Sequence, residues 1–167
     1  MVPDGSTDIF ILNGSVGGDV SFANRNTLTV GAPATLTLLS PTTVTNSGGS
    51  GFINNSGSFV NNGTLFNELG GQLNNSGTLD NFGTLSNRIS GFVMNTGNFN
   101  NQSGGLLIND LSSTIQNDHS IGNEAGATLS NSATINGSGF LVNFGTVDNF
   151  GQLKNAVVNS SDGIRPE

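Results

Sequence analysis

The chain has 167 residues, of which only 9% are charged, and it carries a net charge of −7. Four Lys and Arg residues are too few to neutralise a phosphate backbone, which argues against nucleic acid as a partner. The absence of cysteine excludes disulfide bonds and thiolate metal sites, and no stretch approaches the roughly 18 continuous apolar residues of a membrane span.

The first fifty residues contain three segments that alternate apolar and polar residues, as strands do, at 26–30, 34–38 and 42–46. They are centred on Leu28, Leu36 and Val44, and the residues before them are more apolar still. We therefore expect residues 1–50 to form an N-terminal cap and the first, wider coils of a repeat structure.

Residues 51–156 repeat one six-residue phrase, Gly-x-aliphatic-x-Asn-x, which is clearest in GQLNNSGTLDNFGTLSN at 71–87. The apolar position is held in turn by Ile53, Phe59, Leu65, Leu73, Leu79, Leu85, Val93, Phe99, Leu107, Ile115, Ile121, Leu129, Ile135, Leu141, Val147 and Leu153. Asn follows two residues later in every unit except one, where Gly137 stands instead. These residues are Asn55, Asn61, Asn67, Asn75, Asn81, Asn87, Asn95, Asn101, Asn109, Asn117, Asn123, Asn131, Asn143, Asn149 and Asn155. Such regularity is typical of stacked repeats that build one core jointly.

The spacing of the units predicts an all-β fold, a single-stranded parallel β-solenoid of triangular section, for which a right-handed course is favoured. Each unit alternates with the period of a strand, and Gly and Asn, which tolerate positive φ, mark the bends. Three units make a coil of 18–22 residues, with two-residue insertions such as 69–70, 89–90 and 111–112 at the corners. Residues 157–167 are expected to be a C-terminal tail.

Two columns of side chains should face inward in this arrangement. The aliphatic column supplies the apolar core, and the Asn column can form a ladder of side-chain amides between neighbouring coils. The alternative is that Asn occurs here only because it suits a turn.

The phrases LNNSGTLDNFGTLSN and LVNFGTVDNFGQLKN resemble the repeats of filamentous-haemagglutinin-like adhesins and autotransporter passengers. The resemblance covers about two-thirds of the chain and implies a right-handed β-helix that works at the bacterial cell surface. The N-terminal sequence MVPDGSTDIF has no signal-peptide pattern, so we expect that a start methionine has replaced a natural leader. The secretion motifs of these families are not recognisable in residues 1–50, and left-handed hexapeptide-repeat acyltransferases match the phrase less well.

The sequence offers little for catalysis, and no catalytic, cofactor-binding or metal-binding residue is assigned. His119 has Asp118 and Glu124 nearby, but no nucleophile accompanies it, and a corner position in the repeat accounts for it better. Neither the calcium-binding nonapeptide nor an EF-hand loop occurs. We therefore expect the protein not to be an enzyme, and a polysaccharide-active enzyme is the less favoured alternative.

Outward residues suggest binding instead. A candidate contact surface consists of Phe52, Phe92, Met94, Phe144 and Phe150, unless the corner phenylalanines stack on one another and hide themselves. The Thr-x-Thr pairs at 27–29, 35–37 and 43–45 resemble those of ice-binding solenoids, but their spacing places them on different sides. Ice binding or carbohydrate binding by the solenoid is therefore kept as an alternative function.

These observations predict a structural or adhesive segment of an exported bacterial surface protein, located outside the cell or on its surface. Its expected partners are a host or surface glycan or protein, and a second copy of the chain. Self-association is expected through the C-terminal coil, because no cap follows residues 152–155 and unpaired strand edges attract other strands.

Overall fold

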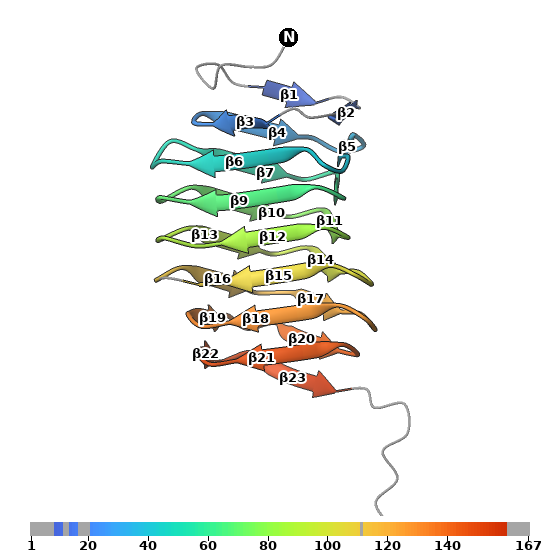
Figure 1. Cartoon of the computed structure of the whole chain (residues 1–167), viewed down its shortest axis with the longest axis vertical. Helices are drawn as coiled ribbons and strands as arrows, with labels where there is room; N and C mark the ends of the chain where they lie inside the picture. The colour runs from blue at the N-terminus through green and yellow to red at the C-terminus, as the bar shows by residue number, and fades with distance from the viewer. Residues whose placement is uncertain (1–8, 12–13, 17–20, 111, 160–167) are drawn as a thin grey trace, which may run out of the picture.

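The computed structural model describes residues 9–11, 14–16, 21–110 and 112–159. This part of the chain forms about seven coils of about 20 residues each, and it contains strands but no helix (Figure 1). Successive strands enter three sheets in turn, and every pairing between neighbouring coils is parallel. The predicted parallel β-solenoid is confirmed.

Each sheet takes every third strand and runs along the whole rod. Sheet A contains β1 (Ile9–Ile11), β4 (Thr27–Val30), β7 (Phe52–Asn55), β10 (Gln72–Asn75), β13 (Phe92–Asn95), β16 (Thr114–Asn117), β19 (Thr134–Asn136) and β22 (Gln152–Leu153). Sheet B contains β2 (Gly14–Val16), β5 (Thr35–Leu38), β8 (Ser58–Asn61), β11 (Thr78–Asn81), β14 (Asn98–Asn101), β17 (Ser120–Asn123), β20 (Phe140–Asn143) and β23 (Ala156–Asn159). Sheet C, which faces the viewer in Figure 1, contains β3 (Ser21–Asn24), β6 (Thr43–Ser47), β9 (Thr64–Glu68), β12 (Thr84–Asn87), β15 (Leu106–Asn109), β18 (Thr128–Asn131) and β21 (Thr146–Asn149).

The first and last described strands belong to the same solenoid as the regular repeats. The strands expected around Leu28, Leu36 and Val44 are β4, β5 and β6, and they pair directly with the strands of the regular repeats. The repeat extends beyond the expected boundary at residue 156, because β23 pairs with β20 as far as Asn159. The rest of the expected cap, at 1–8, 12–13 and 17–20, and of the expected tail, at 160–167, lies outside the described residues.

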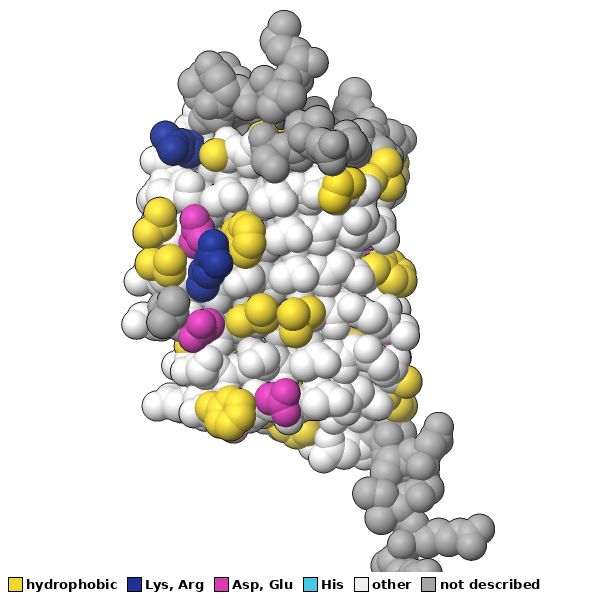
Figure 2. All heavy atoms as spheres, in the orientation of Figure 1, with side chains coloured by type: hydrophobic (Ala, Val, Ile, Leu, Met, Phe, Trp, Pro, Cys, Tyr) yellow, Lys and Arg dark blue, Asp and Glu magenta, His cyan; other side chains and the backbone are white. Residues whose placement is uncertain are grey.

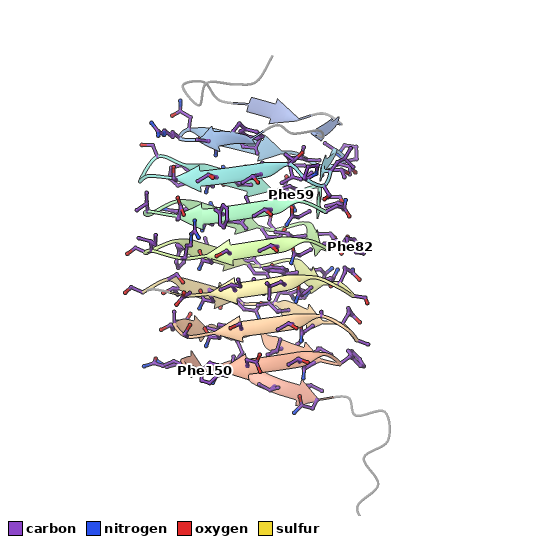
Figure 3. All side chains as sticks on the ribbon, viewed as in Figure 1. Phe59, Phe82 and Phe150 are labelled. Carbon is purple, nitrogen blue, oxygen red and sulfur yellow. The ribbon has the colours of Figure 1, made fainter. Side chains whose placement is uncertain are left out.

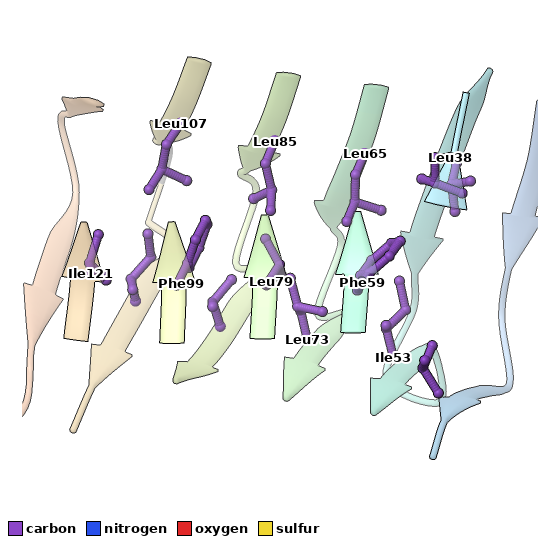
Figure 4. Packing of buried hydrophobic residues seen from close by; sticks show 14 of the residues in the cluster. Leu38, Ile53, Phe59, Leu65, Leu73, Leu79, Leu85, Phe99, Leu107 and Ile121 are labelled. Carbon is purple, nitrogen blue, oxygen red and sulfur yellow. The ribbon is translucent and has the colours of Figure 1, made fainter. Parts of the chain in front are cut away.

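The core is one continuous column of apolar side chains from each sheet (Figure 4). Leu73, Leu79 and Leu85 form one layer of it and are completely buried. Each such side chain contributes about 1.5–3 kcal/mol by leaving water. At the C-terminal end Val147 and Leu153 are only partly buried, so the core weakens toward its last coil.

The Asn side chains form three ladders beside this core, as the sequence predicted. In each ladder the Nδ2 group of one coil donates to the Oδ1 atom of the next coil toward the C-terminus. In sheet C the Nδ2–Oδ1 distances are 2.7–2.9 Å and join Asn24, Asn46, Asn67, Asn87, Asn109, Asn131 and Asn149. Sheet B joins Asn61, Asn81, Asn101, Asn123, Asn143 and Asn159, and sheet A joins Asn55, Asn75, Asn95 and Asn117. The partners lie 18 residues apart where the coil has no insertion, 20 where it has one two-residue insertion and 22 where it has two, which confirms the coil length.

The same amide also fixes the corner. Asn55 Nδ2 donates to the backbone carbonyl of Thr78 at 2.7 Å, and Asn81 Nδ2 donates to that of Leu106 at 3.1 Å. Each carbonyl begins the following strand one coil further on, so a single Asn joins two strands and two coils. This geometry requires both a donor and an acceptor on a short side chain, which a turn preference alone does not explain.

The sheet A ladder is interrupted where Gly137 replaces Asn. Asn117 Nδ2 keeps the regular corner bond, to the carbonyl of Phe140, and Asn155 Nδ2 donates to the backbone carbonyls of Asn117 at 2.9 Å and Gly139 at 2.8 Å. Asn155 was expected to be a rung of the ladder, but it binds backbone because no side chain at 137 offers it an amide.

The role expected for the repeated glycines is corrected by the structure. Positive φ angles occur mainly at inserted corner residues, including Leu69 at 51° and Ile89 at 50°, and not at the glycine that opens each regular unit. That glycine is required by close packing of the coils. A Cβ atom on Gly77 would lie 2.2 Å from the carbonyl oxygen of Gly57.

We predict that Gly77→Ala destabilises the rod strongly, by about 2 kcal/mol or more, because the clash involves backbone and no rotamer can relieve it. Gly49→Ala is the matched control, since nothing lies within 4 Å of the position that its Cβ atom would take and its φ is not positive. The free energy of unfolding, measured in denaturant, checks both. Equal values for the two variants would contradict the close-packing explanation.

We also predict that Asn81→Leu costs about 1–3 kcal/mol for each buried group that it leaves unpaired. Asn61 Nδ2, Asn101 Oδ1 and the carbonyl of Leu106 all lose their partner at this position. Asp80→Ser, on the outer side of the same strand, should change stability by less than about 0.5 kcal/mol. Chemical denaturation of both variants tests the inward placement of Asn81, which similar losses would refute.

Candidate interaction surfaces

Figure 2 shows the face of the rod that carries sheet C, with a few charged side chains and several scattered apolar ones on a surface that is otherwise uncharged. The strand registers of sheet C align one column of residues, Thr43, Thr64, Thr84, Leu106, Thr128 and Thr146. The column beside it is mixed, with Phe66, Ile108 and Asp148 among its members. The Thr-x-Thr pairs of β4, β5 and β6 lie in three different sheets, as predicted, so they build no double column on one face.

The phenylalanines of the candidate contact surface are divided between two places. Phe52 and Phe92 align on either side of Gln72 on sheet A, Met94 lies two residues beyond Phe92, and all of these side chains are partly buried. Phe144 and Phe150 instead stand at corners after β20 and β21 and are 45% and 84% exposed. The five residues therefore form no single surface.

The corner phenylalanines also do not hide one another. Phe82 follows the Asn that ends β11, and the same corner position is taken by Gln102, Glu124 and Phe144 in the next coils. Phe82 is accordingly 45% exposed, and Figure 3 shows it at the opposite edge of sheet C from Phe150.

One ion pair links two coils at another corner. Arg88 Nε lies 2.7 Å from Glu68 Oε2, and the guanidinium carbon lies 4.0 Å from the centre of the Phe66 ring. The pair is partly exposed to solvent, so it contributes at most about 1 kcal/mol. The Arg88 guanidinium therefore makes both of these contacts within the rod.

Of the residues considered for acid–base chemistry, Asp118 and His119 lie at the corner between sheets A and B, whereas Glu124 lies at the next corner, between sheets B and C. His119 is exposed, and the Asp118 carboxylate accepts hydrogen bonds from the backbone N–H of Ser138 at 3.0 Å and from Gln116 Nε2 at 2.7 Å. These two bonds, the backbone one first, lower the pKa of Asp118. Asp118 is thus directed toward Ser138 and Gln116, which gives it a corner-bracing role.

Among the described residues, no group of three or more acidic or histidine side chains is placed so that it could hold a metal ion. Two open depressions occur at corners, beside Ser112 and Leu69, and neither is lined by a carboxylate or a histidine. None of the described segments is a helix long and apolar enough to span a membrane.

The sequence analysis did not assign several residues that the structure places in the ladders or on the exposed apolar surface. Asn24 and Asn46 are buried rungs of the sheet C ladder, and their position two residues after Phe22 and Val44 was the available signal. Phe140, Val157 and Val158 are exposed on the last coils, where alternation alone could not show that the core had become open.

We predict that Gln116→Ala raises the pKa of Asp118 toward its ordinary value, because one of the hydrogen bonds to the carboxylate is lost. The bonds to Asp118 add stability above the pKa of the unfolded chain, and this contribution disappears as the pH falls through the lowered folded pKa. NMR titration of the Asp118 side chain measures the shift. Gln102→Ala, which removes a bond to Asp80 instead, should leave the titration of Asp118 unchanged.

No protein-family model, curated protein or solved structure matches the chain. The structure shows a repeat protein with a β-solenoid fold and asparagine ladders. The likeness to surface adhesins is carried by the six-residue phrase alone.

Proposed function

We propose that this chain is a non-enzymatic structural or adhesive segment of an exported bacterial surface protein. The observation that supports this most is that the inward and outward positions of each strand differ in how much they vary. Inward positions are nearly invariant and build the core and ladders, whereas outward positions change from coil to coil. A rod built in this way keeps its shape while its surface is free to make contacts.

A location outside the cell is supported by composition. The chain has no cysteine and few charges, and its Gly-x-aliphatic-x-Asn-x phrase resembles those of surface adhesins. Each coil contacts mainly its neighbours, as in other solenoids, so folding can proceed coil by coil. Such a chain suits export in an extended form followed by folding outside.

Adhesion would use sheet A. Phe52, Gln72 and Phe92 align in one outward column, and Asn54, Asn74 and Met94 align beside it. Partly buried rings offer apolar contact, and the amides offer donors and acceptors without charge. This combination suits an uncharged host or surface glycan, or a protein, better than an ionic ligand.

A second candidate is ice binding, and the threonine column of sheet C is the observation that favours it. Thermal hysteresis in dilute protein would support this function. Thr84→Lys should then abolish the hysteresis, whereas Thr29→Lys on sheet A should not.

The adhesive role predicts that bacteria displaying this segment on their surface bind glycan-coated or protein-coated plates better than cells that carry the anchor alone. Phe52→Ser combined with Phe92→Ser should lower adhesion several-fold, because the column on sheet A loses its rings. Phe82→Ser, at an exposed corner, is the matched control and should not change adhesion. Adhesion equal to that of anchor-only cells on every coating, with the displayed segment folded, would show that sheet A is not adhesive.

A further inference from the structure

The core opens over the last coil of the described rod. One coil earlier, Leu129, Ile135 and Leu141 are at most 1% exposed. Toward the C-terminus, Val147 and Leu153 are only partly buried, and Val157, in the next position of the apolar column of sheet B, is 43% exposed.

Exposed apolar side chains gather at this C-terminal end. Of the nine large hydrophobic residues that are exposed among those described, four stand at corners elsewhere along the rod, and five belong to the last strands or their corners: Phe140, Phe144, Phe150, Val157 and Val158. Nearby charges are few, with Asp148 after Val147 and Lys154 after Leu153. Phe144 and Phe150 lie at opposite edges of sheet C, so these side chains surround the end of the rod and do not form one patch. An apolar, uncharged partner surface such as its own therefore suits this end.

The last strands also lack partners within the described residues. β21, β22 and β23 each end a sheet, so one edge of each has no neighbouring strand among residues 9–159 that the structure describes. The ladders end in the same region, where Asn149 Nδ2 donates to its own corner, to the Gly151 carbonyl at 3.3 Å. Free edges of this kind are sites for strand addition.

We propose that a second copy of the chain covers this end with its own C-terminal coil, related by a two-fold axis that passes through sheet A. In this contact β22 pairs antiparallel with β22 of the second copy, and β23 pairs antiparallel with β21 of the second copy. The proposal goes beyond the structural and adhesive role and does not depend on it.

The order in which the sheets end determines the position of the axis. Sheet C ends with β21, sheet A with β22 and sheet B with β23, so β22 lies midway between the other two along the rod. A two-fold axis through β22 therefore gives all three pairs the same separation, about 4.8 Å, as in a continuous sheet. An axis through sheet B would leave a gap one strand wide between β22 and β21 of the other copy.

A two-fold contact also covers the open C-terminal ends of both copies at once. Isologous dimers of this kind are the commonest assemblies. Head-to-tail stacking is less suitable, because the ladders do not reach the N-terminal end in sheets A and B. Buried Val30 and Leu38 hold the positions that align with Asn55 and Asn61, so neither sheet offers an Asn rung there to a second copy.

The absence of native cysteine allows the arrangement to be measured by single spin labels. Lys154→Cys marks the proposed contact, and Thr29→Cys on β4 marks sheet A near the other end. Six coil spacings separate β4 from β22, so the two-fold dimer predicts a Thr29–Thr29 distance of about 60 Å and a Lys154–Lys154 distance below about 20 Å. Head-to-tail stacking predicts about 40 Å at both sites, which would overturn the proposal.

Sedimentation over a range of concentrations supplies the second readout. The wild-type chain should form dimers and no larger species, and Val157→Glu should weaken dimerisation at least ten-fold by placing a carboxylate in each half of the contact. Val60→Glu, on the outer face of sheet B, should leave dimerisation unchanged. A wild-type chain that remains monomeric, or a Val157→Glu variant that dimerises normally while folded, would refute the contact.

Discussion

The side-chain amide of the inward asparagine is the interaction on which the rest of this structure depends. Its Oδ1 atom accepts from the coil before, and its two Nδ2 protons reach the next Asn and the backbone carbonyl that begins a neighbouring strand. Aspartate has no proton to donate, and leucine has neither group. Because the ladder amides from Asn24 to Asn131 are buried, an unpaired group would be costly there, so the ladder holds neighbouring coils in register as well as together.

This constraint explains where the rod can vary. The ladder requires close approach of the corners, and glycine provides it, whereas two-residue insertions project outward and leave the strands aligned. Core and ladder thus persist while outward residues and corners change. At the C-terminal end the rungs become longer and more exposed, as in the 3.3 Å contact between Asn143 and Asn159, so the last coils should open first.

Most of the fold could be predicted from the sequence because the same six-residue unit indicates both the strand, by its alternation, and the corner, by its Asn and Gly. The repeated units correspond to the three strands of a coil, and the Asn column was correct from Asn55 to Asn149. The purpose of the repeated glycine could not be predicted, since both close packing and positive φ favour glycine. Asn155 binds backbone carbonyls instead of a neighbouring amide because Gly137 has no side chain there. Phe52 and Phe150 lie apart because Phe52 belongs to a strand of sheet A and Phe150 stands at an exposed corner. Neither is encoded in the local alternation.

Hydrogen exchange of the asparagine side-chain amides tests the central claim most directly. If the ladders hold the coils together, the Nδ2 protons of Asn75, Asn81 and Asn87 should exchange only when the solenoid opens, at rates close to those of the surrounding backbone amides. The outward amides of Asn54 and Asn98 should exchange orders of magnitude faster and provide the internal reference. Equal exchange rates for inward and outward asparagines in the folded protein would contradict the ladder as the interaction that maintains this fold.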